Sequence, residues 1–75
     1  MSEDGKRTGQ ALKEYRKLMY VSQEEVAAEL GYGAASSVCR IEALEYVDRV
    51  QYAEVIVAVE KAAAKKRIKQ AAVPA

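Results

Sequence analysis

Histidine is absent from this chain of 75 residues, and cysteine occurs only once. This composition excludes the usual zinc clusters, a disulfide framework, and Cys–His or Ser–His catalytic pairs. We therefore expect no metal and no cofactor, and an enzyme is the least favoured class. No apolar run approaches the ~20 residues that cross a bilayer, and the first seven residues lack the apolar core of a signal peptide. We expect a cytoplasmic protein without membrane contact, in which Cys39 is reduced.

The length and the hydrophobic content of 51% are those of one small domain. A lone core is marginal at this length, so dimerisation would supplement it. Residues 1–7 are polar and charged, and we expect them to be disordered. Residues 8–69 are predicted to form a single domain. Pro74 ends any helix, so residues 70–75 are expected to form a flexible tail.

The net charge of +1 hides a division along the chain. Residues 10–60 carry five basic and nine acidic side chains, which gives −4, whereas residues 61–69 carry five basic side chains and no acidic one. Affinity for DNA comes largely from phosphates neutralised by lysine and arginine, so an acidic body is unfavourable for DNA binding. The five basic side chains of residues 61–69 would supply part of the positive charge that residues 10–60 lack.

A capping box predicts that a helix begins after Ser22. Glu25 follows three positions on, so each side chain can bond the backbone N–H of the other residue. Apolar residues then recur at helical spacing up to Leu30, and Gly31 stands where helices end in a left-handed residue. The predicted helix is short and ends sharply.

A second short helix is predicted to begin at Ala34 or Ala35, after a tight turn, and to run to about residue 45. Helical spacing divides its side chains between an inward stripe and a small, polar outer face. The inward stripe consists of Val38, Ile41 and Leu44. The outer face consists of Ser36, Ser37 and Arg40.

Two further helices are predicted to flank this pair. Thr8 is a candidate N-cap for a helix that runs to about Met19, and Asp48 is one for a helix that runs from about Arg49 to Lys69. Residues 55–57 are β-branched and would also suit a short strand, but the residues around them favour a helix. We therefore predict an all-α fold of four helices, or five. Its core is expected to contain Leu12, Tyr15, Val26, Leu30, Val38, Ile41, Ile56 and Val59.

The last predicted helix carries more apolar surface than one packed face requires. Exposed apolar surface of this extent usually marks an association site. We expect a homodimer interface that consists of Tyr52, Val55, Ile56, Val57 and Val59.

Taken together, these patterns resemble the helix-turn-helix family of phage repressors and Cro proteins, also called the XRE family. The resemblance extends from Gly9 to Glu42. Its strongest segments are Val21-Ser22-Gln23-Glu24-Glu25-Val26-Ala27 with Leu30-Gly31, and Val38-Cys39-Arg40-Ile41-Glu42, where members commonly carry Ile-Ser-Arg/Lys-Ile-Glu. The resemblance implies a lambda-repressor-like domain and a transcriptional regulator, most often a repressor, that binds a palindromic DNA operator as a homodimer.

The same resemblance implies a structural ion pair and a phosphate contact. Arg16 and Glu42 stand where family members pair an arginine of the first helix with a glutamate that ends the recognition helix. This pair would orient the recognition helix without touching bases. Gln23 stands where members grip a phosphate at the start of the second helix.

The recognition helix itself offers few base-contacting side chains. By the resemblance, Ala35, Ser36 and Arg40 stand where members contact base edges, and Ser37 stands near the DNA backbone. Arg40 can donate twice to guanine, whereas Ala35 can only touch a thymine methyl group. A phosphate contact by Arg40 without base choice is an equally good interpretation.

Several residues depart from the family pattern. Tyr20 replaces the usual glycine after the first helix, which strains the turn if it is left-handed. The turn before Val38 is one residue longer than usual, and Gly33 can take a left-handed conformation there. Cys39 replaces a serine and is expected to be a small, semi-buried residue. The loop at residues 43–48 lacks the glycine and the basic residues that bind phosphate in the family.

The acidic body, the bare outer face and the missing basic loop favour an alternative function. In that hypothesis, the helix-turn-helix fold binds and inhibits a protein partner. Selection of bound DNA from a random pool separates the two hypotheses, because only the first predicts a recovered palindrome.

Overall fold

Four α-helices account for most of the described part of this computed structural model, which comprises the backbone of residues 7–72 and the side chains of residues 7–67. They are α1 (Gly9–Leu18), α2 (Gln23–Leu30), α3 (Ala35–Glu42) and α4 (Arg49–Ala72). No strand occurs among the described residues, and residues 55–57 lie within α4. The predicted all-α fold is confirmed, with four helices.

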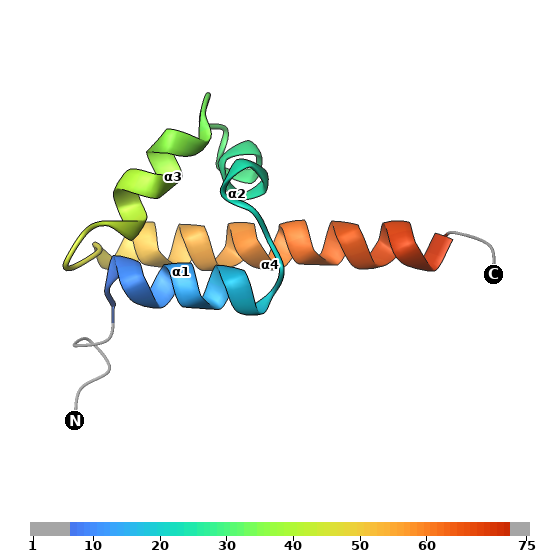
Figure 1. The fold of residues 1–75 in the computed structure, drawn as a ribbon, viewed down its shortest axis with the longest axis horizontal. Helices are drawn as coiled ribbons and strands as arrows, with labels where there is room; N and C mark the ends of the chain where they lie inside the picture. The colour runs from blue at the N-terminus through green and yellow to red at the C-terminus, as the bar shows by residue number, and fades with distance from the viewer. Residues whose placement is uncertain (1–6, 73–75) are drawn as a thin grey trace.

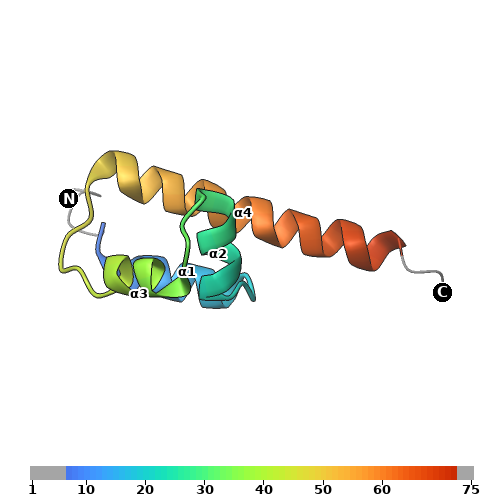
Figure 2. The same cartoon turned by 90° about the horizontal axis from the view of Figure 1, so that it is seen from above.

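The longest helix, α4, runs along the long axis of the molecule (Figure 1). α1 lies alongside it, while α2 and α3 stand out from these two helices as a pair joined by a tight turn. A second view shows that the C-terminal turns of α4 extend past the other three helices (Figure 2). Although α4 is long, no helix among residues 7–72 is apolar enough over its length to cross a membrane.

Side-chain caps begin three of the helices as the sequence predicts. The Thr8 hydroxyl accepts a hydrogen bond from the Ala11 N–H at 3.0 Å. The Asp48 carboxylate accepts from the Val50 N–H at 3.0 Å, so that Asp48 caps α4. These bonds satisfy N–H groups that have no partner within their own helix.

The capping box of α2 is confirmed. The Ser22 hydroxyl accepts from the Glu25 N–H at 3.1 Å, and the Glu25 carboxylate accepts from the Ser22 N–H at 2.8 Å. The hydrogen bond from the Ser22 backbone lowers the pKa of Glu25, and the ammonium group of Lys66 adds to this effect. Glu25 therefore stays ionised in more acidic solution than an isolated glutamate.

Two residues with positive φ turn the chain between helices. Gly31 ends α2 with φ of 79°, as predicted. Tyr20 has φ of 58° in the turn between α1 and α2, which confirms the strained turn expected at this position. Gly33 is not among the described residues with positive φ, so the longer turn before α3 does not use its left-handed freedom.

The core lies between the helices, where α1 and α2 pack on one face of α4 and α3 packs on α1 and α2. Five of the eight residues predicted for it are buried: Leu12, Val26, Val38, Ile41 and Val59. The other three, Tyr15, Leu30 and Ile56, are half-buried and pack against this core. The prediction missed Val21 and Val47, which lie in the connections, Val55 of α4, and the four small residues Ala27, Ala58, Ala62 and Ala63.

The start of α1 packs directly against the end of α3. The Gly9 N–H donates to the carbonyl of Leu44 at 2.9 Å, and the Val47 N–H donates to the carbonyl of Arg7 at the same distance. A Cβ atom at Gly9 would lie 2.4 Å from the carbonyl oxygen of Ile41. Arg7, expected in the disordered N-terminus, is thus bound into the fold, and the rest of that segment, residues 1–6, lies outside the described residues.

Two predicted helix ends are wrong. α3 ends at Glu42 instead of about residue 45, because the chain turns there to bring the Leu44 carbonyl to α1. Leu44 is consequently 45% exposed, and Val47 takes the core position instead. α4 continues to Ala72, beyond the predicted end at Lys69. The last three residues of the predicted tail lie outside the described residues.

Candidate nucleic-acid interface

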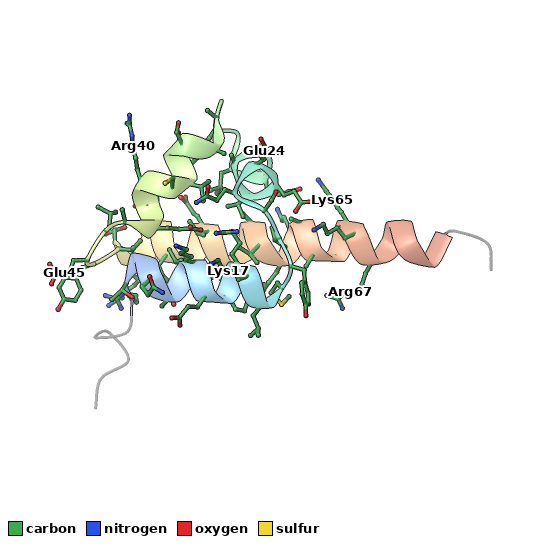
Figure 3. All side chains as sticks on the ribbon, in the orientation of Figure 1. Lys17, Glu24, Arg40, Glu45, Lys65 and Arg67 are labelled. Atoms are coloured by element: carbon green, nitrogen blue, oxygen red, sulfur yellow. The ribbon has the colours of Figure 1, made fainter. Side chains whose placement is uncertain are left out.

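The outer face of α3 consists of small residues and one long cation. Ser36, Cys39 and Arg40 are exposed, whereas Ala35 and Ser37 are half-buried. Arg40 points away from the body of the protein (Figure 3). Of the three residues predicted for this face, Ser36 and Arg40 are exposed, whereas Ser37 is half-buried. Cys39 was expected to be semi-buried, but it lies on this outer face because Val38 and Ile41 occupy the inward positions.

The predicted pair of Arg16 and Glu42 is confirmed, and it is buried. Arg16 Nε lies 2.6 Å from Glu42 Oε2, and Arg16 Nη2 donates to Glu42 Oε1 at 3.2 Å. The two side chains are only 10% and 4% exposed. A third guanidinium N–H donates to the carbonyl of Val21 at 2.9 Å. This two-pronged contact joins the last turn of α1 to the end of α3.

Gln23 belongs to the same polar network, which the sequence did not indicate. Its side-chain amide donates to Glu42 Oε1 at 3.0 Å, so three helices meet at one carboxylate. Gln23 is the first residue of α2 and is half-buried. An amide nitrogen carries two N–H groups, and one remains for a phosphate after this bond. The expected phosphate contact by Gln23 is compatible with this geometry and stays a prediction.

The segment that contains α2, α3 and the connections on either side of them is acidic. Residues 19–48 contain six acidic side chains and one basic side chain, Arg40. Two of the acidic side chains are neutralised by α4, because Lys65 binds Glu29 and Lys66 binds Glu25 at 3.0 Å. Lys66 also donates to the carbonyl of Tyr20. Two lysines near the end of α4 therefore bind α2 and the turn before it. This leaves fewer cations of α4 free to contact DNA phosphates.

Not all cations of α4 are used in this way. Lys65 lies on the side of α4 that faces α2, whereas Arg67 points to the opposite side (Figure 3). Arg67 and Lys61 are both exposed. On the opposite flank, the loop after α3 exposes Leu44, Glu45 and Tyr46 and carries no basic residue, as the sequence indicates.

The predicted dimer strip on α4 is wrong at two of its five residues. Val55 and Val59 are 1% and 0% exposed because they face the core of the same chain. Tyr52 and Ile56 are half-buried against that core, and only Val57 is exposed, at 46%. Val50, which was not part of the predicted strip, is 63% exposed and lines the same groove as Val57.

Among the described residues, no group of three potential metal ligands gathers in one place. The chain matches no family model, no curated protein and no solved structure.

Proposed function

We propose that this chain is a sequence-specific DNA-binding regulator, a repressor of the phage or prokaryotic type that acts in the cytoplasm. It binds a palindromic operator as a homodimer and places α3 in the major groove. The observation that carries the proposal is the buried network of Arg16, Gln23 and Glu42. This network fixes the orientation of α3 through polar contacts while leaving its outer face exposed.

The residues on α3 suit a close approach to DNA. Ala35 and Ser36 are small, so the first turn of the helix can enter a groove without steric conflict. The N-cap residue Ala34 offers no side-chain hydrogen bond, so the N–H groups of that turn keep no side-chain partner at this end. Arg40 follows on the same face as the only long donor of α3. We assign it the bidentate contact to guanine.

The test begins with selection of bound duplexes from a random DNA pool at two salt concentrations, and continues with Arg40→Ala. We expect a palindrome to be recovered, and Arg40→Ala to relax the preference at one base position by about 1–3 kcal/mol. Arg67→Ala is the matched control, since it removes an exposed arginine from α4. Loss of Arg67 should lower the affinity for all DNA sequences by the same factor, because a phosphate contact does not depend on the bases.

Gln23→Ala provides a further comparison, because a phosphate contact is lost equally for every sequence. Fluorescence anisotropy of the recovered duplex measures each affinity. If Arg40→Ala and Gln23→Ala both leave the affinity unchanged in folded protein, α3 is not the base-contacting helix.

The second candidate function is binding to a protein partner through the same face. It is favoured by the acidic residues around α3 and by the use of Lys65 and Lys66 inside the fold. A positively charged protein surface would complement this face better than DNA does. Folded protein that enriches no sequence at either salt concentration would favour this candidate over the first.

A further inference from the structure

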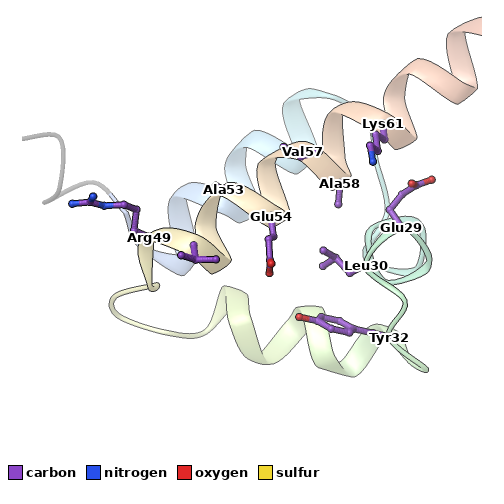
Figure 4. A pocket seen from close by; sticks show the side chains of 10 residues that line it. Glu29, Leu30, Tyr32, Arg49, Ala53, Glu54, Val57, Ala58 and Lys61 are labelled. Carbon is purple, nitrogen blue, oxygen red and sulfur yellow. The ribbon is translucent and has the colours of Figure 1, made fainter.

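An apolar groove of about 640 Å³ lies between α4 and the end of α2 (Figure 4). Val50, Ala53 and Val57 form its wall on α4, and Leu30 and Tyr32 form the opposite wall. Val50 and Val57 are 63% and 46% exposed although they are apolar. α4 thus carries apolar side chains on two faces, of which only one is covered by the core. Apolar surface left open in this way indicates an association site.

We infer that a second copy of this chain covers the groove, in a symmetric dimer whose two α4 helices cross in antiparallel directions beside Val57. The inference deepens the proposed function and rests on it for the choice of a homodimer. It keeps Val57 from the strip predicted from the sequence and moves the rest of the interface away from the face of α4 that meets the core.

The charges along the groove favour a second copy as the partner. Glu54 and Lys61 both line the groove, and they lie equally far from the midpoint between Val57 and Ala58. In a two-fold antiparallel pair, Glu54 of one copy therefore faces Lys61 of the partner copy. The symmetry repeats this contact, which gives two ion pairs around an apolar centre.

The size of the side chains also suits this arrangement. Ala53 is small, so the partner helix can approach α4 closely at this point. Burial of Val50, Val57 and the half-buried Leu30 and Tyr32 supplies an apolar centre, with the charged residues at its rim. The dimer would therefore bury apolar surface in addition to the small core that a domain of this length can form alone.

Sedimentation equilibrium in the absence of DNA tests the inference. The wild-type chain is expected to dimerise at micromolar concentration. Glu54→Lys and Lys61→Glu should each raise the dissociation constant by about tenfold or more, because each places like charges together twice. The double variant Glu54→Lys/Lys61→Glu should return it toward the wild-type value. Glu14→Lys is the matched control, as it makes the same charge change on the exposed surface of α1.

Three results would overturn the inference: a monomer at high micromolar concentration, single variants that dimerise like the wild type, or a double variant that restores nothing. A monomer would leave the groove for another protein. Circular dichroism checks that each variant is folded. Because no DNA is present, failure of the dimer is distinguishable from failure of the proposed DNA binding, which the random-pool selection tests separately.

Discussion

Gly9→Ala is expected to lower the free energy of unfolding by about 3 kcal/mol or more, at the upper end of overpacking effects. The new Cβ would lie 2.4 Å from the carbonyl oxygen of Ile41 and 2.5 Å from two backbone atoms of Glu42. Backbone atoms cannot turn aside as a flexible side chain can, so α1 and α3 would have to separate. That movement would also strain the hydrogen bond from Gly9 to Leu44.

Gly33→Ala is the matched control for this substitution. A Cβ at Gly33 would meet no atom within 4 Å, and the residue does not have positive φ. Its stability should remain within about 0.5 kcal/mol of the wild type. Urea denaturation followed by circular dichroism measures both variants. Equal midpoints for Gly9→Ala and Gly33→Ala would contradict the close contact between α1 and α3.

Glu42→Leu is expected to cost about 3–5 kcal/mol, because it leaves the guanidinium of Arg16 buried without its carboxylate. The amide of Gln23 loses its acceptor in the same variant. Arg16→Met should also be strongly destabilising, since it leaves Glu42 as the uncompensated charge. The double variant should lose clearly less unfolding free energy than the two single variants lose together. The coupling energy between the two residues should be at least ~1 kcal/mol.

The exposed pair of Lys65 and Glu29 provides the contrast. Lys65 is 72% exposed, so solvent screens the interaction. A double-mutant cycle on this pair should give a coupling energy of about 0–1 kcal/mol. If the buried pair shows additive losses, or couples no more strongly than the exposed pair, then Arg16 and Glu42 do not hold α3 in place.

Local signals predicted the helix starts, whereas tertiary contacts determined the end of α3. The caps at Thr8, Ser22 and Asp48 depend on residues within three positions of one another, so the sequence shows them directly. The end of α3 depends on a carbonyl that reaches across to Gly9. Helical spacing continued beyond Ile41 predicts that Leu44 is buried. It could not indicate that the chain leaves the helix at Glu42 to contact α1.

The candidate site was predictable in part, and for two different reasons. The pairing of Arg16 with Glu42 joins residues far apart in the chain, and only the family resemblance indicated it. The link from Gln23 to the same carboxylate had no signal in the sequence. On α4, apolar residues occur on two faces, so their spacing could not tell which face meets the core. Val55 was assigned to the dimer strip for that reason, and Val59 was assigned both to that strip and to the core.

The single thiol of this chain allows the most direct test of the central claim, that the outer face of α3 contacts DNA. Cys39 is exposed on that face, beside Arg40, and no other residue carries a thiol. The measurement is the rate of Cys39 alkylation by iodoacetamide, with and without a saturating amount of the recovered duplex. We predict that this duplex slows alkylation severalfold and that a scrambled duplex does not. An unchanged rate while the duplex is bound would contradict the claim, because DNA would then lie elsewhere on the protein.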